Sequence, residues 1–196
     1  MNQRSTRANG EASRRRILDA AAEIAGERGY SGTSMSEVLK RSGLPKSSIY
    51  WHFSDKDALF AAVIEDSYEQ WLEEFNIRAG AREVAPHELV VLLHDSLASV
   101  PAFLRFGQLV VLERHETELT ARAKFLEIRA NSLRVLADLF ARSTGTDAAS
   151  AAEFAAVALA LVDGAFLARA AGEHGLDDSA ILGRALAAFV ERRCAS

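Results

Sequence analysis

The sequence predicts an all-α protein of about nine helices. Alanine and leucine dominate its 196 residues, β-branched residues are sparse, and there are only three prolines, a composition that favours helices. Apolar residues recur three and four positions apart, and no segment keeps the alternation of a strand. With 49% hydrophobic and 26% charged residues, the chain is expected to be globular rather than disordered.

The first element is a helix from about Glu11 to Arg28, preceded by a flexible basic arm. Residues 1–10 are polar, basic and without periodicity, which is typical of a segment that does not fold. The helix has one apolar stripe, made of Ile17, Ala21, Ile24 and Ala25. Gly29 is expected to end it.

The next two predicted helices are short and are joined by a tight turn. Ser34 and Glu37 have the spacing of a capping box, which predicts a helix start. Gly43 ends that helix, since glycine tolerates a left-handed conformation, and Pro45 suits the first position of the next one. That next helix, Lys46 to His52, surrounds a single buried isoleucine with polar and aromatic side chains. A short helix of this kind is what the major groove of DNA accepts.

The rest of the chain continues the helical pattern. Ser54 is expected to cap a fourth helix that runs to about Ala79. Pro101 forces a later boundary, because the residue before a proline avoids the helical region. The remaining helices are expected at about residues 86–99, 102–113, 117–143, 147–172 and 177–194.

Residues 12–62 resemble the DNA-binding segment of the TetR/AcrR family of transcriptional regulators. The resemblance lies in RRRILDAAAEIAGERGYSGTSM and SGLPKSSIYWHFSDKDALF, most specifically in IYWHF followed by a lysine three residues later. Pro45 stands where many members carry Ser or Thr. The resemblance implies a three-helix helix-turn-helix domain at residues 11–58, after the arm of residues 1–10, and a ligand-binding and dimerisation domain at 59–196. It also implies a homodimeric, ligand-responsive regulator, usually a repressor.

The net charge of −4 is unevenly distributed. Residues 1–60 hold ten Lys and Arg and seven Asp and Glu, which gives +3, so the rest of the chain carries −7. A phosphate-binding face needs only local positive charge, and an acidic body discourages unspecific wrapping of DNA. The charge distribution therefore agrees with a DNA-binding head.

The recognition helix is expected to carry specificity and its neighbours affinity. We expect Lys46, Ser47 and Ser48 to face base edges or the adjoining backbone. The expected phosphate contacts, which the resemblance also implies, are Tyr50, His52 and Lys56, with Trp51 in either role. A lysine in the first turn of a helix opposes the helix dipole, which favours a phosphate near Lys56. Ser34, Arg4, Arg7 and Arg14 complete the predicted set, and a dimer predicts an inverted-repeat operator in double-stranded DNA.

The last two helices are predicted to form the homodimer interface. The eighth is apolar on nearly all sides, and such a helix must be covered all round. Two helices from each subunit would form a four-helix bundle, with Leu161, Phe166, Leu182, Leu186 and Phe189 in the interface. An ordinary core within one chain is the alternative.

The helical body is predicted to bind a small, largely apolar effector of unknown identity. It combines many aromatic residues with polar groups that a core does not need. The predicted wall residues are Trp71, Phe103, Phe106, Gln108, Phe125, Arg129, Asp163 and Phe166. Because a buried carboxylate is costly without a partner, a structural pair between Asp163 and Arg129 is the alternative to a ligand contact. The alternative function is a helical small-molecule-binding protein without specific DNA binding.

No motif supports catalysis or a bound cofactor. The five histidines lack metal-binding spacing, and there is no phosphate loop or nucleophile elbow. Glu113, His115, Glu116 and Glu118 are possible metal ligands, but such a run is more typical of a solvated turn. Cys194 is the only cysteine, which excludes a disulfide within the chain and favours the cytoplasm. The polar N-terminus predicts no secretory signal, and charges interrupt every apolar run, so we expect no membrane span.

Overall fold

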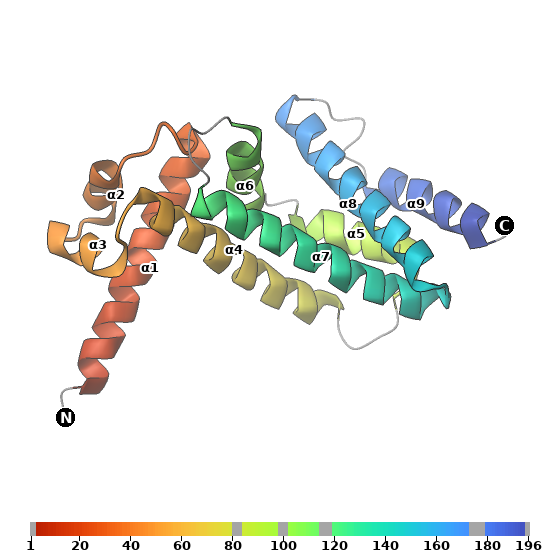
Figure 1. The fold of residues 1–196 in the computed structure, drawn as a ribbon, viewed down its shortest axis with the longest axis horizontal. Helices are drawn as coiled ribbons and strands as arrows, with labels where there is room; N and C mark the ends of the chain where they lie inside the picture. The colour runs from red at the N-terminus through yellow and green to blue at the C-terminus, as the bar shows by residue number, and fades with distance from the viewer. Residues whose placement is uncertain (1–2, 80–83, 98–101, 114–118, 173–178, 195–196) are drawn as a thin grey trace. The chain divides into compact units, whose positions relative to one another are not determined.

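The structure, a computed structural model, describes residues 3–79, 84–97, 102–113, 119–172 and 179–194. Over these residues it is all-helical, as predicted. The described part of the chain forms nine helices (Figure 1): α1 Gln3–Arg28, α2 Met35–Ser42, α3 Lys46–His52, α4 Lys56–Ala79, α5 Pro86–Leu97, α6 Ala102–Leu112, α7 Thr120–Thr144, α8 Ala148–Ala170 and α9 Ser179–Cys194.

The chain forms two compact units. The first consists of Met1–Glu69 and Pro101–Glu127, and the second of Gln70–Val100 and Ile128–Ser196. The first unit therefore holds α1, α2, α3 and α6 with the first parts of α4 and α7. The domain boundary predicted near residue 58 stays a prediction.

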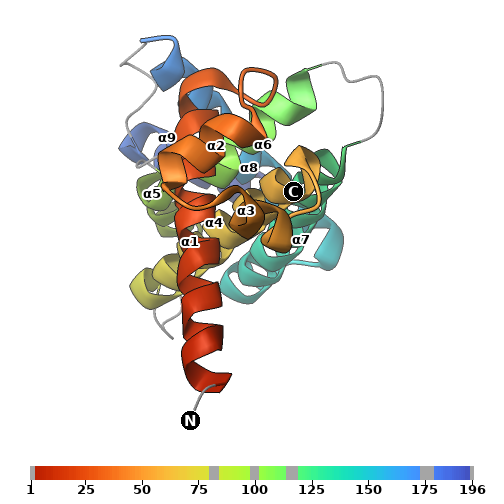
Figure 2. The ribbon, with the colours of Figure 1, turned by 90° about the vertical axis from the view of Figure 1, so that its left-hand side faces the viewer.

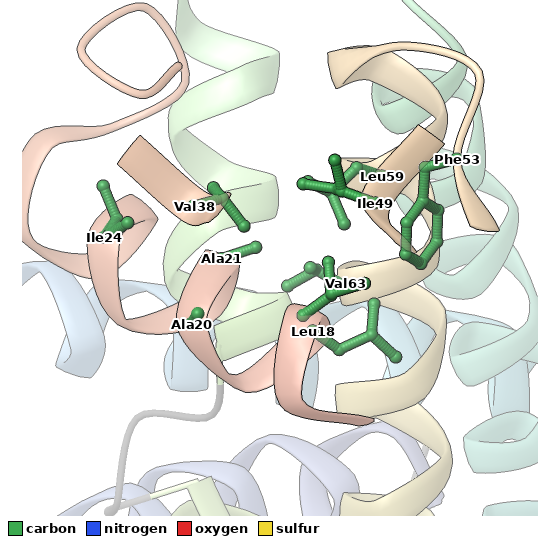
Figure 3. Packing of buried hydrophobic residues seen from close by; sticks show 10 residues of the cluster. Leu18, Ala20, Ala21, Ile24, Val38, Ile49, Phe53, Leu59 and Val63 are labelled. Carbon is green, nitrogen blue, oxygen red and sulfur yellow. The ribbon is translucent and has the colours of Figure 1, made fainter. Parts of the chain in front are cut away.

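A small apolar core holds the first four helices of the first unit together. Figure 3 shows buried members of this core converging from α1, α2, α3 with the residue that follows it, and α4. The buried members are Ile17, Leu18, Ala20, Ala21, Ile24, Val38, Ile49, Phe53, Leu59 and Val63. Ile49 is fully buried and is the buried residue of α3. Since four consecutive helices contribute to one cluster, the core fixes the direction in which α3 presents its other side chains.

Both ends of α2 are as predicted. The Ser34 hydroxyl accepts the N–H of Glu37, and the Glu37 side chain accepts the N–H of Ser34, which together make the capping box. Gly43 ends α2 with a φ of 65°, in the left-handed region that glycine adopts without strain.

α3 has the predicted bounds, and Pro45 is its extended N-cap, whose carbonyl accepts the N–H of Ser48. The predicted cap of α4 was displaced by one residue. Asp55, and not Ser54, caps α4: its Oδ1 accepts the N–H of Ala58 at 2.8 Å. Asp is as good an N-cap as Ser.

α1 begins at Gln3, so the prediction of a flexible arm at residues 1–10 was wrong from Gln3 onward. The segment contains no proline, and a single glycine costs a helix only about 1 kcal/mol. At Gly10 a Cβ would lie 3.8 Å from the ring of Trp51, so α3 borders α1 there. Figure 2 shows the first turns of α1 extending past α2 and α3.

Three aromatic rings join the end of α1 to α4 and α6 within the first unit. Tyr30 meets Phe60 edge-on with ring centroids 5.4 Å apart, and Phe60 stacks on Phe106 at 4.6 Å. Phe60 and Phe106 are almost completely buried. These contacts attach the helix-turn-helix to α6 through Tyr30, which lies directly after α1.

α6 and α7 meet at a glycine. A Cβ at Gly107 would lie 2.1 Å from a ring carbon of Phe125, so the phenyl ring occupies the space that any side chain at 107 would need. Phe125 is 4% exposed.

The second unit has its own core, made by α5, α8 and α9 with the second part of α7. Leu186 of α9 and Phe154 of α8 are fully buried there. A Cβ at Gly183 would lie 3.2 Å from the carbonyl oxygen of His87, which shows how closely α9 approaches α5.

Within the described residues, α8 (Ala148–Ala170) is long and apolar enough to cross a membrane, with a mean hydropathy of 1.8. Asp163, the one charged residue between Glu153 and Arg169, interrupts the apolar run of this helix, as expected. A core helix of a soluble protein passes the same test, and α8 contributes eight buried residues to the second unit.

Candidate nucleic-acid interface

α3 presents a polar and aromatic surface on the side away from the core. Of the residues predicted to meet DNA, Lys46, Ser47, Tyr50 and Trp51 are exposed, and Ser48 and His52 are half-buried. The structure therefore gathers these six predicted residues on one short helix.

Two large aromatic side chains dominate this surface. Trp51 is 76% exposed and Tyr50 is 51% exposed. The Lys46 ammonium lies 5.9 Å from the centre of the Tyr50 ring, within cation–π range. The indole N–H and the phenol O–H are both hydrogen-bond donors, and donors of this kind contact phosphate oxygens in protein–DNA interfaces.

Several of the basic side chains of the first unit are already engaged within the chain. Arg15 pairs with Asp66 at 2.6 Å, and Arg16 donates to the carbonyl of Ser42 at 2.7 Å, at the end of α2. On the α1–α2 face, Arg28 pairs with Glu37, and Arg41 pairs with Glu23 and Glu27.

Among the described side chains of the first four helices, Arg14, Lys40 and Lys46 have no acidic partner. Arg16 and Lys56 have none either, but they donate to backbone carbonyl oxygens. The Arg14 guanidinium lies 5.7 Å from the centre of the Phe53 ring, which places it near the end of α3. Arg14 and Lys46 thus leave positive charge beside α3 that is available to a polyanion. The side chains of Arg4 and Arg7 lie outside those the structure describes.

Lys56 has partners within the chain. Its ammonium donates to the carbonyl oxygen of Tyr30 at 3.1 Å and lies 4.1 Å from the centre of the Tyr30 ring. These contacts explain a lysine at the start of α4 without a phosphate, so the argument from its unfavourable position loses its force. The ammonium has three N–H donors and can still bind a phosphate. No local signal in the sequence pointed to Tyr30, which lies 26 residues away.

The Ser34 hydroxyl is occupied by the capping box and lies 2.9 Å from the Ser36 hydroxyl. Both contacts lie within the chain, and they hold the N-terminus of α2 in place.

His52 is held toward its neutral form. Burial lowers its pKa first, and the positive charge of Arg14 lowers it further. A neutral imidazole donates one hydrogen bond, whereas the protonated ring donates two.

The predicted effector residues are divided between the two units. Phe103, Phe106, Gln108 and Phe125 belong to the first unit. Phe106 stacks on Phe60, Phe125 fills the space at Gly107, and Phe103 meets Tyr68 edge-on at 5.4 Å. These three phenyl rings are buried packing residues in their own unit.

The other four candidates, Trp71, Arg129, Asp163 and Phe166, belong to the second unit. Arg129 and Asp163 form a two-contact ion pair, one contact measuring 3.2 Å, which confirms the structural alternative for them. Trp71 is 9% exposed, and its Nε1–H donates to the Ser96 hydroxyl at 3.1 Å.

Two of the five predicted dimer residues are internal. Leu182 and Leu186 are buried in the second unit, so the alternative of an ordinary core holds for these two side chains. Phe189 is half-buried and meets Phe154 edge-on at 5.8 Å. Leu161 and Phe166 are half-buried.

A different apolar face of α8 and α9 is exposed. Leu167 is 66% and Ile181 is 37% exposed. The exposed face also includes Ala156, Ala160, Gly164, Ala185 and Ala188. Helical spacing connects Ala156, Ala160, Gly164 and Leu167, so the sequence carries the pattern of this face, although the predicted interface residues were large apolar ones.

Of the possible metal ligands, His115, Glu116 and Glu118 lie outside the described residues. Glu113 accepts a hydrogen bond from the Ser31 hydroxyl at 3.2 Å. In the part of the chain that the structure describes, no three His, Cys, Asp or Glu side chains are grouped to hold a metal.

The pKa of His52 predicts how stability depends on acidity. The folded chain binds the proton of His52 more weakly than the unfolded chain, so stability falls as the pH drops below the unfolded value, about 6.5. We expect His52→Gln to remove this part of the decline. Urea denaturation between pH 7.5 and pH 5 would measure it, and an equal decline in both proteins would contradict it.

Comparison with known proteins identifies the family of the helix-turn-helix segment. The family described as "Bacterial regulatory proteins, tetR family" matches residues 17–63, which run from the second half of α1 into α4. The HTH-type transcriptional regulator AcrR of Shigella flexneri is 39% identical over 62 residues, 32% of this chain and 29% of that protein. The fatty acid metabolism regulator protein of Bacillus subtilis is 23% identical over 120 residues, 61% of this chain and 62% of that protein.

The chain thus aligns with less than two thirds of the length of either relative. The crystal structure of the transcriptional regulator FadR from Bacillus subtilis in complex with stearoyl-CoA has a TM-score of 0.67 and 19% identity, and the match covers 89% of this chain and 96% of that one. This likeness shows a shared fold. The two relatives are named as regulators and not as enzymes. The helix-turn-helix segment of the chain, residues 17–63, therefore belongs to the tetR family of bacterial regulatory proteins.

Proposed function

We propose that the protein is a homodimeric transcriptional repressor of the cytoplasm, which binds an inverted-repeat operator and is released by a small apolar effector. The observation that carries the proposal is the surface of α3, where Lys46, Ser47, Tyr50 and Trp51 are exposed on a helix held by a complete helix-turn-helix core.

In the proposed complex, α3 enters the major groove. Lys46, Ser47 and Ser48, at its N-terminal end, meet base edges or the adjoining backbone. Tyr50, His52 and Lys56 contact phosphates, and Trp51 serves either role. Arg4, Arg7 and Arg14 add charge along α1. Ser34 acts through the start of α2.

Lys56 tests the electrostatic part of this assignment. We expect Lys56→Met, which keeps an unbranched side chain beside the Tyr30 ring, to weaken binding to all DNA sequences alike. The slope of log affinity against log salt should fall by about one unit for each bound lysine lost. Fluorescence anisotropy with an operator obtained by selection from random duplexes, and with a scrambled duplex, would measure both quantities.

The matched control is Arg41→Met, because Arg41 is paired with Glu23 and Glu27 on α1. It should leave the slope unchanged. A Lys56→Met protein with an altered sequence preference and an unaltered slope would show that the role assigned to Lys56 is incorrect.

Dimerisation is proposed through the exposed apolar face of α8 and α9. A Cβ at Gly164 would have no atom of the chain within 4 Å, and Leu167 is largely exposed, so this face has room for a second copy. Small side chains at Ala156 and Ala160 allow helices to approach closely. Pairing of two such faces would give a four-helix bundle.

Leu167→Glu tests this interface. Leu167 is exposed in the protomer, so the fold should survive, whereas a carboxylate buried without a partner in the dimer costs several kcal/mol, roughly 3 or more. We expect a monomer at micromolar concentration by sedimentation velocity and a large loss of operator affinity.

Leu112→Glu is the control for that experiment, since Leu112 on α6 is 80% exposed. It should leave a dimer. A stable dimer in Leu167→Glu, or a monomer in the unmodified protein at the same concentration, would place the interface elsewhere or remove it.

The effector is proposed to be a small molecule with a long or bulky apolar part. The support is the number of aromatic residues in the body together with the relative that was crystallised with stearoyl-CoA. Trp71 and Phe166 of the second unit remain candidate wall residues.

Ligand binding should be visible as stabilisation, because a ligand that binds only the folded state raises the melting temperature. At one hundred times its dissociation constant, a ligand adds about 2.7 kcal/mol, which shifts the melting temperature of a chain of this size by roughly 5–10 °C. We expect stearoyl-CoA or another member of an apolar panel to do so and to release operator DNA. Stabilisation without any operator binding would favour the helical small-molecule-binding protein instead, and no stabilisation by any compound would count against an apolar effector.

A further inference from the structure

A carboxylate of α4 caps α7. The Asp57 Oδ2 accepts the N–H of Thr120 at 2.7 Å, and its Oδ1 accepts the N–H of Ala121 at 3.0 Å. Thr120 and Ala121 are the first two residues of α7, whose N–H groups have no partner inside their own helix. The cap of α7 is therefore supplied by a residue 63 positions away in the sequence.

The arrangement of the two helices explains why a carboxylate belongs there. α4 and α7 begin side by side and run in the same direction, and a second contact joins them further along, from Lys124 to Glu65 at 3.1 Å (Figure 1). Parallel helices place their positive dipole ends next to each other. Asp57 lies in the first turn of α4 as well as at the start of α7, so its charge is favourable for both ends.

The same turn of α4 carries Lys56, which binds the carbonyl and the ring of Tyr30. Two adjacent residues thus link the first turn of α4 to two other places: Lys56 contacts Tyr30 after the end of α1, and Asp57 contacts the start of α7. α3 ends four residues before Lys56, so this turn also follows the recognition helix directly.

We propose that Asp57 is a positioning residue that couples α7 to the recognition helix. It ties the first turn of α7 to the turn that carries Lys56, so that a displacement of α7 moves the DNA-contacting end of α4 and α3 with it. α7 continues into the second unit at Ile128, so the capped N-terminus of α7 and the second unit are parts of one helix. A conformational change in the second unit could therefore reach the cap through this helix. The inference rests on the proposed DNA-binding function and adds a regulatory contact to it.

Thr120→Pro tests the coupling from the α7 side. It removes one N–H donor to Asp57 at the first helical position, where proline is well tolerated. We expect hydrogen exchange of the Ala58 and Leu59 amides, in the first turn of α4, to accelerate about tenfold, the effect of losing one charge-assisted hydrogen bond. The matched control is Ala148→Pro at the first position of α8, which Asp147 caps locally through Ala149 and Ser150.

Asp57→Asn tests the same contact from the α4 side, with Asp55→Asn as its control, because Asp55 caps only its own helix. On a selected operator, the unmodified dimer should bind much more weakly when the spacer between half-sites is changed by one base pair. We expect this affinity penalty to shrink about tenfold in Asp57→Asn and in Thr120→Pro. In the double variant the penalty should shrink no further than in either single variant.

Unchanged exchange at Ala58 and Leu59 in Thr120→Pro, or additive effects in the double variant, would overturn the coupling. If selection from random duplexes with the unmodified protein yields no preferred DNA sequence, the proposed function is overturned instead. In that case the exchange measurements still decide whether Asp57 links the two helices.

Discussion

The burial of Ile49 is the constraint on which the DNA-facing part of the molecule depends. α3 has seven residues, and a helix of that length is not stable in water by itself. It persists because Ile49 and Phe53 are buried among side chains of α1, α2 and α4. The aromatic and basic residues on the other side of α3 are thereby held at a fixed angle, although they contribute little to the fold themselves.

Features set by neighbours in the sequence could be predicted. The capping box of Ser34 and Glu37, the left-handed Gly43 and the bounds of α3 all follow from local backbone chemistry, and the structure has them as expected. Features set by distant partners could not. The partner of Lys56 lies 26 residues earlier and that of Asp57 63 residues later, and no local pattern identifies either. The early start of α1 was missed for a related reason, since polarity was taken to mean disorder although nothing in the segment stops a helix.

Periodicity identifies apolar residues that must be covered, but it does not identify what covers them. Leu182 and Leu186 were assigned to a partner chain, yet the chain covers both with its own helices. The small residues that α8 leaves exposed contributed little to an argument based on large side chains. The pair of Arg129 and Asp163 was easier to foresee, because an ionised group in an apolar helix requires an opposite charge nearby.

Gly107 gives the first unit a mechanical property. The Phe125 ring of α7 occupies the space that a side chain at Gly107 of α6 would need, so the two helices interlock there. Because packed interiors tolerate little overlap, neither helix can slide along the other at this point without displacing the ring. α6 and the part of α7 around Phe125 should therefore move together in any rearrangement of the first unit.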